Sequence, residues 1–170
     1  MLYRENLPTL ETLSAAIARF NVEYPRPAMK PPCIDEIVPI ASFQPSALLC
    51  KLPGVYAFVN EHFVVYLGKA SVKPLGKRIC CHLKRDESGL YIFDKEISDQ
   101  RIEKPTKVAI VAFPKDRAFE ACALEEFLIG EIWPPLNQQA VQLGAAQLEW
   151  IRNELLEKAG SPQGTESASD

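Results

Sequence analysis

Apolar residues recur along the chain with two different periods, one typical of helices and one typical of strands. Four segments have helical spacing, and most are bounded by residues that start or stop helices. The expected helices are residues 9–20 with Thr9 as the cap and Asn21 as the end, 75–85, 117–132 with Asp116 as the cap, and 143–158 followed by Gly160.

Three shorter runs are rich in β-branched and aromatic residues, which favour strands. The first two, residues 55–59 and 62–67, flank the polar dipeptide Asn60-Glu61 and predict an antiparallel hairpin. The third, residues 107–113, predicts a buried strand. Together with the helices, these runs predict an α+β fold: a small three-stranded, mostly antiparallel sheet flanked by helices.

The same patterns divide the 170 residues into four parts, of which one is a core of ordinary domain size. Residues 1–50 combine the first helix with a stretch of four prolines and are expected to form an N-terminal helical and proline-rich extension. Residues 51–140 are expected to form the core. Residues 141–159 are expected to form a C-terminal helix packed on the core, and residues 160–170 a disordered tail.

Composition narrows the class of protein. The chain is 47% hydrophobic and 24% charged, which is typical of a globular protein. No uncharged run is long enough to cross a bilayer without proline, and the first residues do not form a signal peptide, so we expect a soluble, cytoplasmic protein and no membrane partner. The five cysteines are odd in number and lack a CxxC pair, which favours reduced thiols, and the presence of only two histidines argues against a structural zinc site.

The net charge of −3 argues against a nucleic-acid partner only when it is taken alone. The excess of acid lies mostly in residues 138–170, whereas residues 69–85 hold six basic side chains and no acidic one. Such a patch favours contact with a phosphate backbone, and the alternative is a solvated helix surface. The candidate nucleic-acid-binding residues are Lys69, Lys73, Lys77, Arg78, Lys84 and Arg85.

Two further segments carry candidate chemistry. On the helix over 75–85, Arg78 and His82 lie one turn apart at the edge of the apolar stripe and are expected to face the cleft beside the sheet, although a lone histidine is more often a core residue. On the helix over 117–132, Glu120 and Glu131 share a polar wedge. Glu125 and Glu126 instead project through apolar sectors, where a carboxylate must be paired, protonated or metal-bound; a structural ion pair is the alternative.

Placed in order, these residues resemble the GIY-YIG nuclease family. Its first signature appears as Gly54-Val55-Tyr56 and its second as Tyr66-Leu67-Gly68. A helical arginine follows at Arg78, with the histidine of the restriction-enzyme branch one turn later at His82. Glu125 and Asn137 match the family's helical glutamate and the asparagine about twelve residues beyond it, whereas Glu126 misses by one.

The resemblance covers residues 51–137 and departs from the family in two places. The stretch between Lys69 and Arg78 is about two residues longer than in the repair-type members. Val55 and Leu67 stand where the family has isoleucines, and both replacements are apolar for apolar.

The resemblance implies a metal-dependent endonuclease that acts on DNA as a monomer or homodimer. Glu125 would hold one Mg²⁺ (or Mn²⁺). A single carboxylate is enough for such an ion, because it keeps several of its waters. Tyr56 would be the general base, assisted by His82, because a free tyrosine with a pKa of about 10 is rarely ionised at neutral pH. Arg78 would bind the phosphate, Tyr66 and Lys69 would position it, and Asn137 would orient Glu125 or a metal-bound water.

Two other functions fit the same residues. The chain could be a nuclease for single-stranded DNA or RNA, or a catalytically silent nucleic-acid-binding module. Within DNA cleavage, the pattern does not separate restriction from defence, mobile-element or structure-selective roles.

Overall fold

Four antiparallel strands form one sheet in the computed structural model, which describes residues 7–26, 29–44, 46–61, 63–84 and 104–137. The strand order is β1-β4-β2-β3. The strands are β1 (Glu36–Pro39), β2 (Gly54–Val59), β3 (Val64–Ala70) and β4 (Lys107–Ala112). The α+β class, the hairpin and the third strand are confirmed. The expected helix 143–158 and tail 160–170 lie outside the described residues.

The prediction of three strands is wrong, because β1 adds a fourth at the edge beside β4. Its four residues, Glu-Ile-Val-Pro, are too few to show the period of a strand and lie just after the proline-rich stretch. Pro39 lacks an amide donor and is tolerated in an edge strand. A strand of this kind is recognised only through its pairing with β4.

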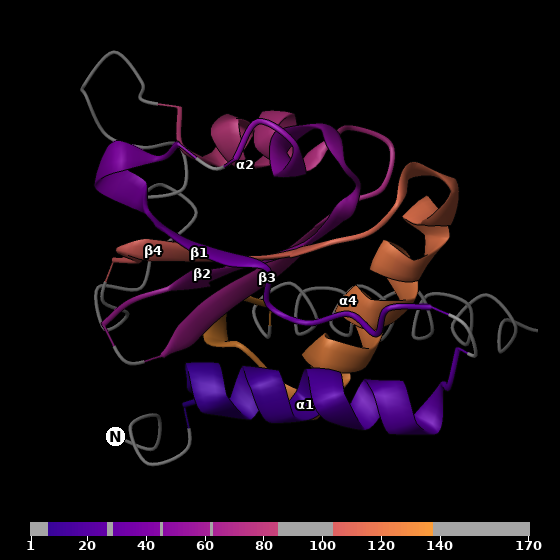
Figure 1. Cartoon of the computed structure of the whole chain (residues 1–170). Helices are drawn as coiled ribbons and strands as arrows, with labels where there is room; N and C mark the ends of the chain where they lie inside the picture. Colours follow the sequence, from indigo (N-terminus) through magenta and orange to yellow (C-terminus); the bar gives the residue numbers. More distant parts are fainter. Residues whose placement is uncertain (1–6, 27–28, 45, 62, 85–103, 138–170) are drawn as a thin grey trace, which may run out of the picture. The chain divides into compact units, whose positions relative to one another are not determined.

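The helices lie on both faces of the sheet (Figure 1). Helices α1 (Leu10–Glu23) and α4 (Ala118–Ile132) cover one face, and the short helix α2 (Leu75–His82) covers the other. Three 3₁₀ turns complete the described elements: η1 (Ile40–Ser42), η2 (Leu49–Lys51) and η3 (Lys115–Arg117).

The helix ends correct three details of the prediction. Thr9 caps α1 as expected, through a capping box with Thr12, but the helix continues past Asn21 to Glu23. Asp116 does not cap α4, because it lies inside the 3₁₀ turn that precedes the helix. Helix α2 ends at His82, one residue before Leu83, and not at residue 85.

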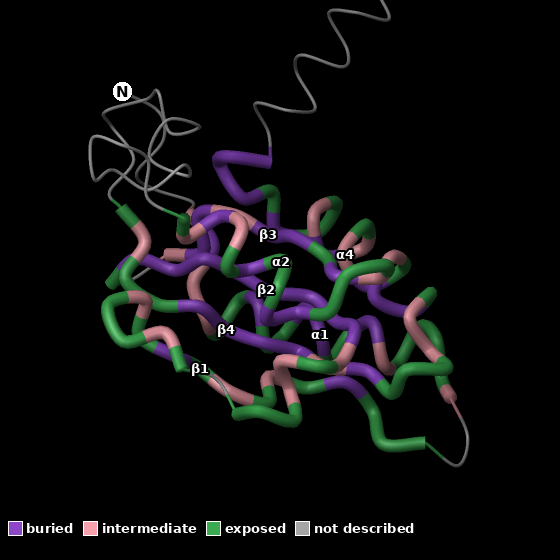
Figure 2. The backbone as a smooth tube through the Cα atoms, turned by 90° about the horizontal axis from the view of Figure 1, so that it is seen from above, coloured by how far each residue is buried: buried purple, intermediate pink, exposed green. Residues whose placement is uncertain are grey.

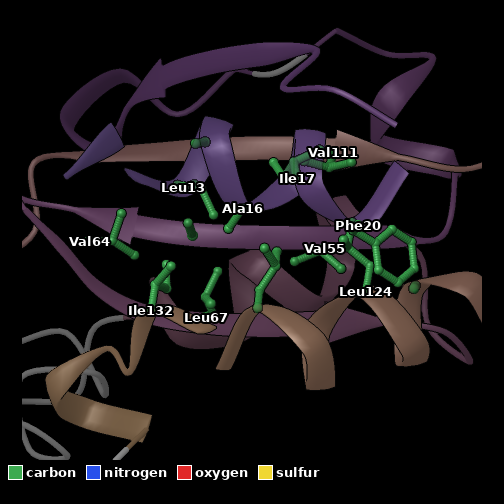
Figure 3. Packing of buried hydrophobic residues seen from close by; sticks show 14 of the residues in the cluster. Leu13, Ala16, Ile17, Phe20, Val55, Val64, Leu67, Val111, Leu124 and Ile132 are labelled. Carbon is green, nitrogen blue, oxygen red and sulfur yellow. The ribbon is translucent and has the colours of Figure 1, made fainter. Parts of the chain in front are cut away.

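The two faces of the sheet bury different side chains. The α1/α4 face is the larger and is aliphatic apart from Phe20, Phe113 and the partly buried Phe127 (Figure 3); its residues include Leu13, Ile17, Val55, Leu67, Val111, Leu124 and Leu128. The α2 face holds Tyr56 and Phe58 together with Val65, Leu75, Ile79 and Ile110. Burial is concentrated along β2, β3 and β4, whereas β1 is mostly exposed (Figure 2).

No helix among the described residues is long and apolar enough to cross a membrane.

Candidate active site

A buried hydrogen bond joins Tyr56 to His82 on the α2 face. The Tyr56 hydroxyl and His82 Nε2 lie 2.8 Å apart. Alternation along β2 turns Tyr56 and Phe58 towards α2, and His82 enters the same space from the last turn of that helix. The rings of Phe58 and Tyr66 each lie 5.7 Å from the His82 ring, centroid to centroid. The pair is therefore enclosed by aromatic side chains.

Gly68 makes room for this pair. It lies opposite Tyr56 in the β2–β3 register, and a Cβ at this position would be 2.5 Å from the Tyr56 hydroxyl and 2.9 Å from the Tyr66 ring. Gly54 is constrained in the same way, since a Cβ there would be 2.2 Å from the carbonyl oxygen of Val111. The glycines of both signatures are thus required by close packing.

Burial sets the protonation of the two partners. It raises the pKa of the Tyr56 hydroxyl well above its usual value, with a further rise from Tyr66, while Arg78 acts in the opposite direction. Burial, assisted by the positive charge of Arg78, lowers the pKa of His82 to about 4. At neutral pH both groups are uncharged, and His82 can accept the Tyr56 proton at Nε2 when its own proton is on Nδ1.

Arg78 lies one turn before His82 on α2 and is exposed to solvent, and its charge and hydrogen bond act to lower the pKa of the Tyr56 hydroxyl. Tyr66 is partly buried, with its ring centroid 6.3 Å from that of Tyr56. The structure thus brings Tyr56, Tyr66, Arg78 and His82 together on the α2 face.

Lys69 and Glu125 form a second group, on the other side of the edge strand β3. Lys69 Nζ lies 2.7 Å from Glu125 Oε2, and this hydrogen bond is the main reason why the pKa of Lys69 is raised. The Glu125 side chain is 15% exposed, whereas Glu126 is exposed to solvent. The charge of Glu125 also raises the pKa of Tyr56, so the two groups interact across the strand.

Asn137 binds the backbone of β3. Its Oδ1 accepts a hydrogen bond from the amide of Leu67 at 2.7 Å, and its Nδ2 donates to the Leu67 carbonyl at 2.9 Å. Both polar atoms of the side chain are therefore hydrogen-bonded to Leu67, and the expected orientation of Glu125 or of a metal-bound water by Asn137 stays a prediction. The side chain is buried and acts as a clamp on the strand that carries Tyr66, Gly68 and Lys69.

The remaining basic candidates lie on the surface. Lys73, Lys77 and Lys84 are exposed on and around α2, and Arg85 lies outside the described residues.

One buried charged group, Glu120, is not among the candidates from the sequence. Glu120 is 5% exposed, with Arg26 Nη1 at 2.6 Å from Oε2 and Arg117 Nη2 at 2.7 Å from Oε1, the latter without hydrogen-bond geometry. Glu131 of the same polar wedge lies 2.6 Å from Arg19 of α1. The sequence did contain an indication of this burial. Glu120 lies four residues before Leu124 and eight before Leu128, and this spacing places all three on the same face of the helix.

The donor set limits the kind of metal that could bind. Among the described residues, no three His, Cys, Asp or Glu side chains form a cluster. Glu125 is a single, partly buried carboxylate with one oxygen on Lys69. This suits Mg²⁺, which keeps several waters and commonly uses one carboxylate together with substrate phosphate.

Among known proteins, the similarity that is found is to solved structures. No family model matches the chain, and no curated protein matches it. One similar solved structure is the GIY-YIG N-terminal endonuclease domain of UvrC from Thermotoga maritima, bound to its catalytic magnesium. The match is to a nuclease domain. It has 28% sequence identity, covers 52% of this chain and 86% of the other, and has a TM-score of 0.37, which does not establish a shared family.

Proposed function

We propose that this chain is a divalent-metal-dependent nuclease that hydrolyses phosphodiester bonds in DNA. The observation that carries the proposal is the buried hydrogen bond of 2.8 Å between Tyr56 and His82, with the exposed Arg78 one turn away. Hydrolysis of a phosphodiester needs a group that takes a proton from water and a cation that meets the phosphate, and this arrangement offers both.

The pKa values favour a proton relay over a preformed tyrosinate. Because burial raises the pKa of Tyr56, its hydroxyl would give up a proton only while it accepts one from the attacking water. His82, with a pKa of about 4, is unprotonated at neutral pH and would take the Tyr56 proton at Nε2. A substrate phosphate next to Arg78 would offset the charge that lowers the pKa of His82, and His82 would become a stronger base when substrate is bound.

The other residues would bind and orient. Arg78 and Lys69 would contact phosphate oxygens, and Tyr66 would position them. A Mg²⁺ or Mn²⁺ ion held by Glu125 would neutralise charge on the phosphate and the leaving oxygen. Asn137 would act indirectly, by fixing β3 through Leu67.

A cleavage assay tests the proposal. The purified protein is incubated with duplex DNA, single-stranded DNA and RNA, each with Mg²⁺, Mn²⁺ or EDTA. We expect cleavage of DNA that requires the metal, and end mapping on random-sequence DNA would show whether it is sequence-specific. Preferential cleavage of single-stranded DNA or RNA would show that duplex DNA is not the substrate. Binding of nucleic acid without any cleavage would show that the chain is a nucleic-acid-binding module and not a nuclease.

Two neighbouring glutamates provide a matched pair for the metal assignment. Glu125→Ala should abolish metal-dependent cleavage while DNA binding survives, because it removes the partly buried carboxylate. Glu126→Ala, one residue along the same helix and exposed, should have little effect. Retained cleavage by Glu125→Ala would remove the metal assignment, and an equal loss in both variants would contradict the choice of Glu125 over Glu126.

A further inference from the structure

Val72 is the most exposed large apolar residue of the described chain, at 96%. It lies in the turn of residues 71–74, between β3 and α2. An isolated exposed valine is ordinary on a protein surface. Val22, for example, is 79% exposed on α1. What distinguishes Val72 is its place, three residues after Lys69 and six before Arg78, between the two elements that carry the candidate site.

Both ends of this turn are anchored. Ala70 pairs with Gly54 at the end of the sheet. On the other side, the Leu75 amide donates to the Leu52 carbonyl at 2.9 Å, and Gly76 packs so closely that a Cβ there would lie 2.7 Å from Cys50 Sγ. The backbone therefore holds Val72 at a defined position between β3 and α2.

The charges around Val72 identify the kind of partner. Residues 69–84 hold five basic side chains and no acidic one, and Lys73 and Lys77 are both exposed. An apolar side chain among cations fits a polyanion that also has an apolar surface, which in duplex DNA is the edges of the bases inside a groove. The turn joins Lys69 on β3 to Arg78 on α2, the two candidate phosphate-binding residues, which favours a phosphodiester polymer over an anionic membrane.

We propose that Val72 enters a groove of duplex DNA and contacts base edges, while Lys73 and Lys77 contact the flanking phosphates. This inference rests on the proposed nuclease function and extends it, because it names the element that selects where the strand is cut. Phosphate contacts position a protein on DNA but carry no sequence information, whereas an apolar contact reads a thymine methyl or the ease of opening a base step.

The test compares Val72→Ser with Val22→Ser, an exposed valine on α1. Neither change should alter the melting temperature, because both side chains are exposed. Affinity for a random-sequence duplex at constant salt should fall about tenfold for Val72→Ser and stay unchanged for Val22→Ser. End mapping should show a changed distribution of cleavage positions for Val72→Ser. The apolar replacement Val72→Ile should keep the wild-type distribution.

Lys73→Gln separates apolar from ionic contact. It should reduce the slope of log affinity against log salt by about 0.9 and leave the cleavage positions unchanged, whereas Val72→Ser should leave that slope unchanged. If the wild-type protein cleaves DNA and Val72→Ser matches it in affinity and cleavage positions, the inference fails and the proposed function survives. Failure of the wild type to bind or cleave any nucleic acid overturns both. Val72-dependent binding to vesicles of anionic phospholipid, without such dependence for DNA, overturns the inference alone.

Discussion

Both faces of the sheet bury side chains completely, but burial has a different effect on each face. On the α1/α4 face, Leu124 and Leu128 are 0% exposed and pack among aliphatic side chains. On the α2 face, Tyr56 is also 0% exposed, but its hydroxyl is a polar group that is hydrogen-bonded to the His82 ring. Exclusion of water stabilises the fold on one face, and on the other it shifts the pKa of two groups in the directions that keep both neutral.

The comparison implies that stability and cleavage can be changed separately. An aliphatic side chain contributes through its volume, so its removal leaves a cavity. A buried hydroxyl contributes one hydrogen bond, so its removal leaves the shape of the core nearly intact. The following changes test that separation.

Tyr56→Phe should have the largest effect on cleavage. The ring keeps its packing, but the relay loses the atom that takes the proton from water, and we expect the single-turnover cleavage rate to fall about 10²- to 10⁴-fold. The free energy of unfolding, measured by chemical denaturation, should fall by only about 1–3 kcal/mol, because His82 Nε2 loses its partner. Cleavage at the wild-type rate would remove Tyr56 from the proton transfer.

Leu124→Ala should show the opposite pattern. This side chain is 0% exposed at the centre of the α1/α4 face, and its truncation should lower the free energy of unfolding by about 2–5 kcal/mol. The cleavage rate of the folded protein, measured well below its melting temperature, should be nearly unchanged. A loss of cleavage as large as that of Tyr56→Phe in a folded Leu124→Ala protein would show that the faces are coupled.

The pH dependence of stability should report His82. Its pKa is about 6.5 in the unfolded chain and about 4 in the folded protein, so between these values the unfolded state binds a proton that the folded state excludes. This contribution is complete above pH 6.5 and is lost as pH falls to about 4, a decrease of roughly 3 kcal/mol. Denaturation of wild type and His82→Gln at pH 7 and pH 5 should show the extra loss only in the wild type. Parallel losses would mean that His82 titrates normally.

Gly68→Ala should have a smaller effect than the loss of the hydroxyl, with Gly130→Ala as its control. The added methyl would meet the Tyr56 hydroxyl, and a displacement of about 1 Å can cost about 100-fold in rate. At Gly130, within α4, a Cβ meets nothing within 4 Å, and alanine should stabilise the helix by about 0.5–1 kcal/mol without changing cleavage. Equal cleavage by both variants would show that the close contact at Gly68 has no catalytic consequence.

Local patterns predicted the α2 face better than its surroundings. The helical spacing of Arg78 and His82 and the alternation along β2 are short-range properties, and the structure brings these residues together around Tyr56. The link between Glu125 and Lys69 joins distant elements, and spacing alone could not identify Lys69 as the partner that the Glu125 carboxylate required.

The misses arise from contacts distant in sequence. Strand β1 is defined by its pairing with β4 about seventy residues later. Glu120 is buried because Arg26, from the proline-rich stretch, reaches it. The hydrogen bond of Asn137 to the Leu67 amide, seventy positions earlier, was also not indicated by the local sequence. Such partners depend on the path of the chain in space, which the spacing of residues in one segment does not contain.

The clamp at Asn137 also bears on how molecules of this protein meet. Among the described residues β3 is the last strand of the sheet, and the outer edge of such a strand is a place where a strand from another molecule could add. The side-chain amide of Asn137 satisfies both groups of Leu67, as a neighbouring strand would. One asparagine side chain thus takes the place that a neighbouring strand would occupy at the middle of β3.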